Sequence, residues 1–352
     1  MDDQYLDELQ KEIYQKTKLS FIRHEINYNI YRMKTIDLSI IIPVYNAALS
    51  IERCLNSIFK QDTQYTYEII LIDDGSKDDS VNIIKKISKK NIILHQQNNA
   101  GPSVARNKGI ELSKGRYCAF LDADDYWING FIEKTINFLD FHPECIAVNV
   151  AQKHLTISGN SLIPSCYSQY SMPFILTDFF SFWADYMHVC TGSVVIRNDK
   201  LKDIGGMRTD LRITEDLELW ALISTYGQWG FIPEILFVSD GGDTTRSIGW
   251  LNKMKIRWKN APNIEVWEKR IIRHLPKELP LNYLRARGRI SRNLTYCQIL
   301  SGRLSLSRKE ALKYGSYFDK DIIGFLMNIA KYNSFTWWIL SRFLQYREFH
   351  RK

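Results

Sequence analysis

The most constraining feature of the sequence is a short apolar run that ends in a cluster of carboxylates. Residues 117–121 have the composition of a buried strand, and Asp122, Asp124 and Asp125 follow directly. Such a cluster needs a cation, a hydrogen-bond donor or open water, because burying an unpaired charge is costly. On continued strand geometry, Asp122 and Asp124 would point the same way and would suit Mg²⁺ or Mn²⁺. The alternative is a polar turn that caps a helix.

Strands and helices alternate along the first part of the chain. The predicted strands are residues 38–46, 67–72, 91–95 and 117–121, and the predicted helices between them are 49–59, 78–89 and 101–113. This alternation predicts an α/β fold with a parallel, doubly wound sheet. Ligands of such sheets bind outside the carboxyl ends of the strands. We therefore expect Tyr45, Asn46, Asp73 and Asp74 to converge with the carboxylates after residue 121.

Two common phosphate-binding signatures are missing from the sequence. No GxGxxG follows the first predicted strand and no GxxxxGK[ST] occurs, which argues against a usual dinucleotide-binding enzyme and against a P-loop NTPase. A cation on Asp122 and Asp124 would hold phosphates without either signature.

Four segments at the predicted strand ends resemble motifs of one family. They are Ile-Ile-Ile-Pro-Val-Tyr-Asn at 40–46, Leu-Ile-Asp-Asp-Gly-Ser at 71–76, Asn-Ala-Gly-Pro-Ser-Val-Ala-Arg-Asn at 99–107 and Phe-Leu-Asp-Ala-Asp-Asp at 120–125. Together they resemble the inverting family 2 glycosyltransferases, tightly over 38–130 and more loosely as far as residue 245. The resemblance implies the GT-A fold, a Rossmann-like, mostly parallel sheet flanked by helices. It also implies transfer of a sugar from a nucleotide-sugar donor.

The resemblance also assigns roles on the donor side. Pro43 and Tyr45 match positions that line the nucleotide base, and Asp74 matches a carboxylate that accepts from the uracil imide N–H, so the donor is expected to be a UDP-sugar. Arg106 matches a basic residue near the base and phosphates; the alternative is a solvated helix arginine. Asp73 is an alternative cap for the following helix.

Asp122-Ala123-Asp124 match the family's DxD motif. By resemblance, Asp124 binds Mn²⁺ or Mg²⁺, and Asp122 reaches the ribose or the metal's ligand shell, so that the metal neutralises the departing diphosphate. Asp125 is expected to be a cap.

On the acceptor side, residues 213–220 match the family's Glu-Asp motif. The resemblance makes Asp216 the general base, with Glu215 adjacent, since an acceptor hydroxyl needs a positioned carboxylate to take its proton. Acidic residues in a first helical turn, with Thr214 as the N-cap, are the alternative reason for this pattern. The aromatic cluster over 179–186 is expected to be core or lid packing, with a sugar platform as the minor interpretation. The segment 237–247, with Asp240, Asp243 and Arg246, lacks the family's usual His and leaves a third metal ligand open.

The last hundred residues differ from the rest in charge. Residues 251–352 contain 22 Lys and Arg against 7 Asp and Glu, while residues 1–250 contain 25 against 32. This asymmetry predicts an anionic partner. Residues 332–352, with Trp, Phe and Leu beside Arg and Lys, fit an interfacial membrane helix or, equally, an amphipathic helix packed on the body or a partner. Nucleic acid is not expected, because no recognised module is visible.

We therefore predict three parts: a helical N-terminal extension over 1–36, a transferase domain over 37–249, and a basic, mostly helical region over 250–352. The boundary between the nucleotide-binding and acceptor-binding halves falls after residue 125. No signal-peptide pattern and no apolar run long enough to span a bilayer is visible, and the six cysteines show no metal spacing. We expect a cytoplasmic enzyme, peripheral at the cell membrane.

The predicted function is a metal-dependent, inverting sugar transfer from a nucleotide-diphospho-sugar to the hydroxyl of a saccharide or lipid-linked saccharide, in bacterial surface polysaccharide or glycolipid synthesis. Two alternatives stay open at this point. One is a nucleotidyltransferase on a similar sheet, although residues 43–46 are not the Gly-rich, basic loop it would need. The other is a non-catalytic protein that binds nucleotide sugars or scaffolds a membrane complex.

Overall fold

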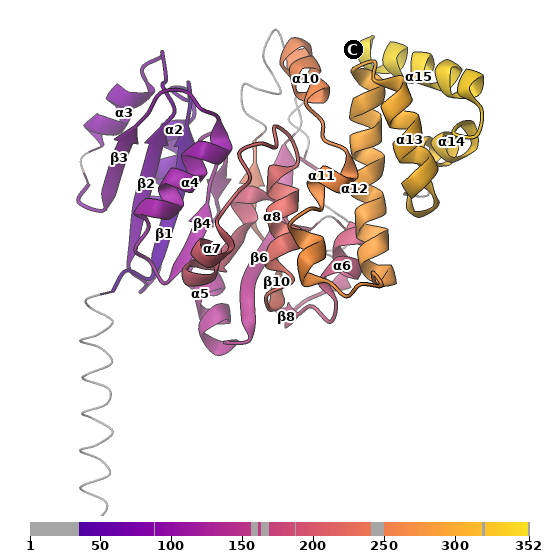
Figure 1. Ribbon diagram of the computed structural model, residues 1–352. Helices are drawn as coiled ribbons and strands as arrows, with labels where there is room; N and C mark the ends of the chain where they lie inside the picture. The colour runs from indigo at the N-terminus through magenta and orange to yellow at the C-terminus, as the bar shows by residue number, and fades with distance from the viewer. Residues whose placement is uncertain are drawn as a thin grey trace, which may run out of the picture.

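A computed structural model describes residues 35–87, 89–155, 161–162, 169–186, 188–240, 250–318 and 321–350 (Figure 1). The first part of the chain alternates strands and helices as predicted. Its elements are β1 (Leu38–Val44), α2 (Ile51–Phe59), β2 (Tyr67–Asp73), α3 (Ser80–Lys86), β3 (Ile92–Gln96), α4 (Pro102–Leu112) and β4 (Tyr117–Phe120). The predicted amphipathic helix near the N-terminus lies outside the described residues.

The second part of the chain completes the sheet and adds helices. Its elements are β5 (Tyr126–Trp127), α5 (Phe131–Phe141), β6 (Cys145–Leu155), β7 (Ser161–Leu162), β8 (Phe174–Ile175), α6 (Phe179–Tyr186), β9 (Val194–Arg197), α7 (Asn198–Ile204), α8 (Glu215–Ile223) and β10 (Gln228–Ser239). β6 is a long strand at the centre of this part, and β7 and β8 are short strands that pair with β6 and β10. The pattern gave no bounds for β10, because an irregularity around Pro233 interrupts its alternation.

The strands form one mixed sheet in the order β3-β2-β1-β4-β9-β6-β10-β5. β1 to β4 pair in parallel, β9 runs antiparallel to both β4 and β6, and β6 and β10 are parallel again. The predicted α/β architecture, a Rossmann-like sheet flanked by helices, is confirmed. The parallel half places the ends of β1, β2 and β4 at one edge, which is where the predicted polar residues follow.

Helices cover both faces of the sheet because the strands alternate their apolar side chains. Leu38, Ile40 and Ile42 of β1 pack in one cluster with α2 and α5, whereas Ile41 belongs to the cluster on the opposite face. On that face α4 approaches β1 closely at Gly109, where a Cβ atom would come within 2.3 Å of the Ile41 side chain. This close packing fixes α4, and with it Arg106, against the sheet.

Pro43 sits in a central strand, where its missing N–H would usually weaken the pairing. The register with β4 ends at Ile41 and Phe120, so the Pro43 position is past that pairing. Pro43 and Val44 of β1 and Asp122 and Ala123 after β4 line a cavity at this edge of the sheet.

The C-terminal part is helical and packs on the body of the protein. It contains α10 (Trp250–Lys259), α11 (Ile264–Trp267), α12 (Leu281–Leu300), α13 (Leu304–Tyr314), α14 (Ile322–Ala330) and α15 (Ser334–Phe349). Tyr283 of α12 and Trp337 of α15 share one continuous core cluster with Trp220 of α8. No helix among the described residues is long and apolar enough to cross a membrane. The domain boundary at residue 249 stays a prediction, since 241–249 lie outside the described part.

A buried ion pair fastens α8 to this C-terminal part. Glu218 is fully buried, and Arg270 donates to both of its carboxylate oxygens, with Nε 2.7 Å from Oε1. Arg270 also donates to the carbonyl oxygen of Gly206 at 3.1 Å. The start of α8, which carries Glu215 and Asp216, is thus fixed from outside the sheet.

Removal of Arg270 should destabilise the fold strongly. Arg270→Met leaves the buried Glu218 carboxylate without its partner, so we expect the free energy of unfolding to fall by about 3–5 kcal/mol in chemical denaturation. Arg285→Met is the matched control, because the Arg285–Asp185 pair is about half exposed and should cost less than about 1 kcal/mol. Equal losses in the two variants would contradict this role for Arg270.

Candidate active site

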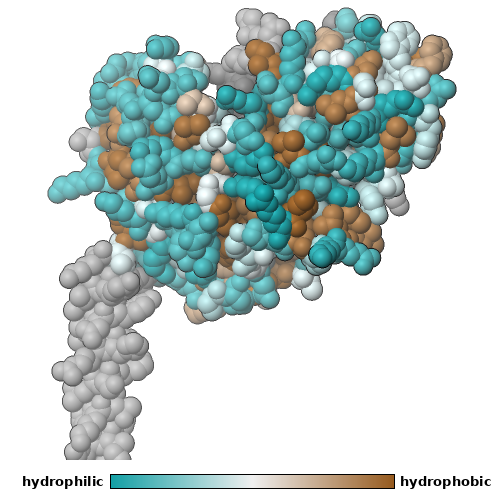
Figure 2. Space-filling view, viewed as in Figure 1, coloured by the Kyte–Doolittle hydropathy of each residue, from teal (hydrophilic) through white to brown (hydrophobic). Residues whose placement is uncertain are grey.

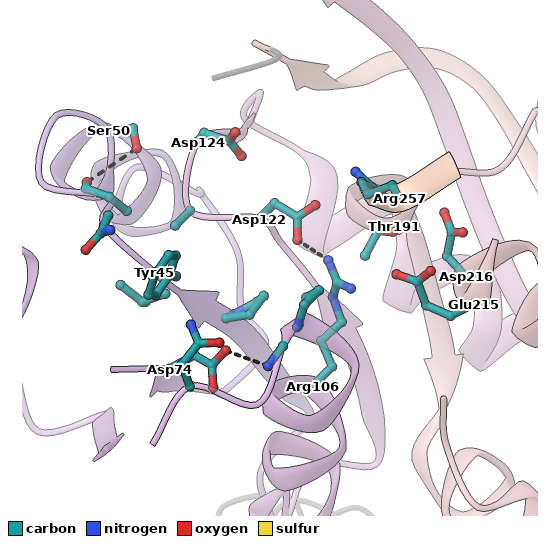
Figure 3. A pocket seen from close by; sticks show the side chains of 18 residues that line it. Tyr45, Ser50, Asp74, Arg106, Asp122, Asp124, Thr191, Glu215, Asp216 and Arg257 are labelled. Atoms are coloured by element: carbon teal, nitrogen blue, oxygen red, sulfur yellow. Dashed lines mark hydrogen bonds and ion pairs between the residues drawn. The ribbon is translucent and has the colours of Figure 1, made fainter. Parts of the chain in front are cut away.

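The predicted site residues line one cavity of about 500 Å³ at the carboxyl edge of the sheet (Figure 3). All of the residues assigned to donor, metal or base come together there: Pro43, Tyr45, Asp74, Arg106, Asp122, Asp124, Glu215 and Asp216. They come from elements distant in the sequence, so the convergence expected from the strand ends is present in the structure. Their chemical roles stay predictions.

The turn after β1 forms one end of the cavity. Asn46 has a left-handed φ of 51°. Its backbone N–H donates to Ser76 Oγ at 3.0 Å, and its Oδ1 accepts from the Lys77 N–H at 2.7 Å. The turns after β1 and β2 are thereby tied together. Tyr45 is 53% exposed and lines the cavity, so one ring face is open to a planar ligand.

Asp74 shapes the loop that leads into α4. Its Oδ1 accepts from the Ala100 N–H and Gln97 Nε2, each at 2.8 Å, and its Oδ2 accepts from the Gly101 N–H at 2.8 Å. Gly101 has a φ of 95°, which a side chain would strain. Asp73 caps a turn rather than the following helix, because its Oδ1 accepts from the Ser76 N–H and α3 begins only at Ser80.

Arg106 is a buried cation at the centre of the cavity, not a solvated helix arginine. Its Nη2 lies 2.5 Å from Asp122 Oδ1, and its Nε has no hydrogen-bond partner among the described residues. Burial alone would lower the pKa of Arg106, but the charges of Asp122, Glu215 and Asp216 outweigh burial and raise it. One guanidinium therefore balances carboxylates from both sides of the cavity.

Asp122 and Asp124 do not project as a continued strand would place them. β4 ends at Phe120, so the strand alternation stops before them. Figure 3 shows the Asp122 carboxyl group turned toward Arg106 and that of Asp124 apart from it, further along the turn. Burial, helped by the charge of Asp122, raises the pKa of Asp124 from 3.8 to about 6.

Asp125 is not a helix cap. It is buried, and its Oδ1 accepts from the backbone N–H of Asp240 at 2.9 Å, so it joins the turn after β4 to the end of β10. Asp240 forms an ion pair with Arg53, which also donates to the carbonyl oxygen of Asp124 at 2.5 Å. Burial and the charges of Asp122 and Asp124 raise the pKa of Asp125 well above its ordinary value. Asp243 and Arg246 lie outside the described residues.

Asp122 and Asp124 could bind a divalent cation only if substrate phosphates or water supplied its remaining ligands. Within the described part of the chain, no three His, Cys, Asp or Glu side chains gather closely enough to hold a metal. Asp124 and Asp122 supply two hard oxygen donors on one cavity, which is what Mg²⁺ uses when substrate phosphates and water complete its shell. Burial first and the charge of Asp122 second raise the pKa of Asp124, and a bound cation would offset both effects.

Glu215 and Asp216 open α8 on the opposite side of the cavity. Thr214, just before them, is the N-cap by position, but it has a left-handed φ of 61° and its hydroxyl caps nothing in the helix. A β-branched residue in this region is strained, a feature that clusters at functional sites. The Glu215 Oε2 atom is buried without a hydrogen-bond partner.

Both carboxylates hold protons more tightly than usual. Burial, followed by the charge of Asp216, raises the pKa of Glu215, and burial also raises the pKa of Asp216, with Asp122 adding to it. Asp216 is partly exposed at the cavity and Glu215 is buried, so Asp216 is the more accessible base. A carboxylate with a raised pKa is a stronger proton acceptor.

Sequence reasoning missed Arg257 and Thr191, which also line the cavity. Arg257 belongs to α10, and Figure 3 shows it beside Thr191 and Asp216, across the cavity from Tyr45. Its only signal was the excess of Lys and Arg over residues 251–352, which predicted an anionic partner but no individual site residue. The aromatic residues Phe179, Phe180 and Trp183 of α6, by contrast, are buried in the core and do not line this cavity.

Comparison with known proteins decides the family. The sequence profile described as glycosyl transferase family 2 matches residues 39–205. A UDP-Glc:alpha-D-GlcNAc-diphosphoundecaprenol beta-1,3-glucosyltransferase WfaP of Escherichia coli is 33% identical over 191 residues, which cover 54% of this chain and 71% of that protein. This chain is a family 2 glycosyltransferase. The non-catalytic and nucleotidyltransferase alternatives are therefore set aside.

Two further similarities show how much of each relative this chain matches. The minor teichoic acid biosynthesis protein GgaB of Bacillus subtilis is 31% identical over 225 residues, 62% of this chain but 25% of that protein. The structure of S. aureus TarS 1–349 in complex with UDP covers 90% of this chain and 92% of that one, with a TM-score of 0.56 and 16% identity. The match to GgaB spans only a quarter of that protein. The match to TarS shows a shared fold, which supports the predicted GT-A architecture of this glycosyltransferase.

The Asp124 carboxylate should destabilise the metal-free glycosyltransferase at neutral pH. Its folded pKa of about 6 lies above the ordinary 3.8, so its charge opposes folding above pH 6, and this cost disappears as the pH falls toward 4. In EDTA, Asp124→Asn should raise the free energy of unfolding at neutral pH by about 1–2 kcal/mol, with a smaller gain at pH 5. Asp199→Asn, with a 68% exposed side chain on α7, is the control that should change neither value. A destabilised Asp124→Asn protein at neutral pH would contradict the charge argument.

Proposed function

We propose that this glycosyltransferase moves a sugar from a UDP-sugar to an acceptor hydroxyl, with metal assistance and with inversion at the anomeric carbon. The observation that carries the proposal is the division of one cavity into two ends. Tyr45 and Asp74 lie at one end, Glu215 and Asp216 lie at the other, and Asp122, Asp124 and Arg106 lie between them.

The donor's base is proposed to bind between Pro43, Tyr45 and Asp74. The half-exposed Tyr45 ring offers a stacking face, and Asp74 Oδ2 accepts only one hydrogen bond within the described residues. A carboxylate oxygen has room for another donor, which the imide N–H of uracil would supply. The likeness to TarS in complex with UDP supports this choice of nucleotide without deciding it.

Asp124 and Asp122 would hold Mn²⁺ or Mg²⁺ together with the donor diphosphate. When bound, such an ion acts as a Lewis acid that stabilises the negative charge of the departing UDP. Arg106 contributes a fixed positive charge close to Asp122 at the same place. Arg257, on the far side of the cavity, is suited to a phosphate of the donor or the acceptor.

Asp216 is proposed to act as the general base. It removes the proton from the acceptor hydroxyl, the acceptor oxygen forms its bond to the anomeric carbon, and the bond from that carbon to the diphosphate oxygen breaks. Because Asp216 and the diphosphate-binding residues lie on different sides of the cavity, one displacement through the carbon inverts its configuration. Burial, with the charge of Asp122, raises the pKa of Asp216 and so makes it a stronger base.

The acceptor is proposed to be a saccharide or a lipid-linked saccharide of bacterial surface polymers. The names of the relatives include a diphosphoundecaprenol-linked acceptor and teichoic acid biosynthesis. A lipid-linked acceptor would be presented at a membrane, which agrees with the proposed peripheral location of this enzyme at the inner face of the cell membrane.

Replacement of Asp216 should abolish transfer but not donor binding. In Asp216→Asn the side-chain oxygen can still accept from the Leu217 N–H, so α8 keeps its start, but the base is lost. We expect at least a roughly 100-fold slower release of UDP from UDP-sugars with Mn²⁺ present. A panel of nucleotide sugars identifies the donor first. Asp210→Asn, an exposed carboxylate on the loop before α8, is the matched control and should keep full activity. Full activity of Asp216→Asn would contradict the role of Asp216 as the base. If the wild type turns over no nucleotide sugar, the proposed function is rejected.

A further inference from the structure

The two C-terminal helices carry large apolar side chains on both of their faces. Met327 of α14 and Trp337 and Leu344 of α15 face inward and belong to the main core cluster. A second set of large apolar side chains on the same helices faces outward, with exposed fractions between 45% and 79%: Ile322, Phe325, Ile329, Phe335, Trp338 and Phe343. We call this set the outer face of α14 and α15.

The outer face is unusual for a surface exposed to water. A surface helix normally has one apolar stripe and a polar opposite side, and helices that are apolar all round are covered by protein or lipid. Large contiguous apolar patches on soluble proteins mark interaction sites. In Figure 2 the surface over α14 and α15, at the upper right, carries brown and pale residues with teal ones between them. Nothing among the described residues covers the outer face.

The charge of this segment identifies the kind of partner. α14 and α15 together contain two cations, Arg342 and Arg347, and a single acidic residue, Glu348, which accepts from the Tyr296 hydroxyl of α12. Arg342 and Arg347 are exposed on α15, and the Arg342 guanidinium lies 5.7 Å from the Trp338 ring centre. Phe, Trp and aliphatic side chains beside arginines are the composition of helices that lie in the interface of an anionic membrane.

The end of α15 packs against α10, a helix that contributes a residue to the cavity. The ring of Phe349, at the end of α15, lies 6.2 Å from the buried Trp258 ring of α10, and Lys255 of α10 lies 4.8 Å from the Phe349 ring. α10 carries Arg257 into the cavity. The C-terminal end of α15 therefore lies beside the helix that carries Arg257.

We propose that the outer face of α14 and α15 docks this protein on an anionic lipid bilayer. The apolar side chains enter the interface, and Arg342 and Arg347 remain at the level of the phosphate headgroups. The biological reason for docking rests on the proposed function, because docking would bring the cavity close to a lipid-linked acceptor in the membrane. The binding itself does not depend on the sugar, the metal or the base.

The test is co-sedimentation of the full chain with vesicles rich in phosphatidylglycerol, compared with vesicles of phosphatidylcholine alone. The wild type should bind the anionic vesicles, and added salt should weaken the binding. The double variant Phe325→Ser/Phe343→Ser should lower the partition coefficient onto anionic vesicles at least about tenfold. Arg342→Glu should weaken binding to anionic vesicles but leave binding to phosphatidylcholine vesicles unchanged. The matched control is Phe141→Ser/Met172→Ser, which removes two apolar side chains elsewhere that are even more exposed (80% and 72%, against 62% and 54%) and should bind as the wild type does.

Two parallel measurements separate the possible failures. Release of UDP from soluble UDP-sugar should be unchanged in all these variants, which would show that they fold. If no protein releases UDP but the wild type still binds vesicles, the proposed function is rejected and the docking proposal is retained. The docking proposal fails if the wild type does not bind vesicles, or if both double variants bind alike. It also fails if sedimentation without lipid shows dimers that Phe325→Ser/Phe343→Ser dissociates, because the outer face would then join two copies of the chain.

Discussion

The ion pair between Arg106 and Asp122 is the interaction on which the rest of the site depends. The carboxyl edge of the sheet gathers Asp122, Asp124 and Asp125 within reach of Glu215 and Asp216, and such a concentration of buried negative charge opposes folding. A single buried guanidinium, fixed by the close packing of α4 on β1, lies between the two groups. Burial, together with the neighbouring carboxylates, raises pKa values on both sides of the cavity. In our account a divalent cation and the acceptor's proton relieve this cost during the reaction.

The first half of the fold and its side of the site could be predicted from the sequence. Parallel strands end at one edge, so residues such as Tyr45, Asp74 and Asp122 converge whenever the strands are recognised, and the four short motifs specify them. The finer geometry could not be predicted. Asp124 departs from strand alternation because β4 ends at Phe120, and Asp125 is tied to β10, whose course depends on an irregularity that no local pattern reveals.

The acceptor side shows the limit of sequence reasoning more clearly. The Glu-Asp motif located Glu215 and Asp216, and both stand in the first turn of α8 as helix capping also predicts, although the hydroxyl of Thr214 caps nothing in the helix. Arg257 was unpredictable because it reaches the cavity from a helix outside the matched family segment. The C-terminal helices were expected to pack on the body or to meet a membrane. In the structure one side of α14 and α15 packs on the body, and the opposite side is free for a partner.

The account's central claim is that the two carboxylate groups in the cavity have different jobs. The most direct test is calorimetric titration of UDP into the wild type, Asp124→Asn and Asp216→Asn, each with Mn²⁺ and with EDTA. We predict metal-dependent UDP binding in the wild type, its loss in Asp124→Asn and its retention in Asp216→Asn. Binding of UDP that is equally tight in EDTA, or that is lost in Asp216→Asn and kept in Asp124→Asn, would contradict the claim.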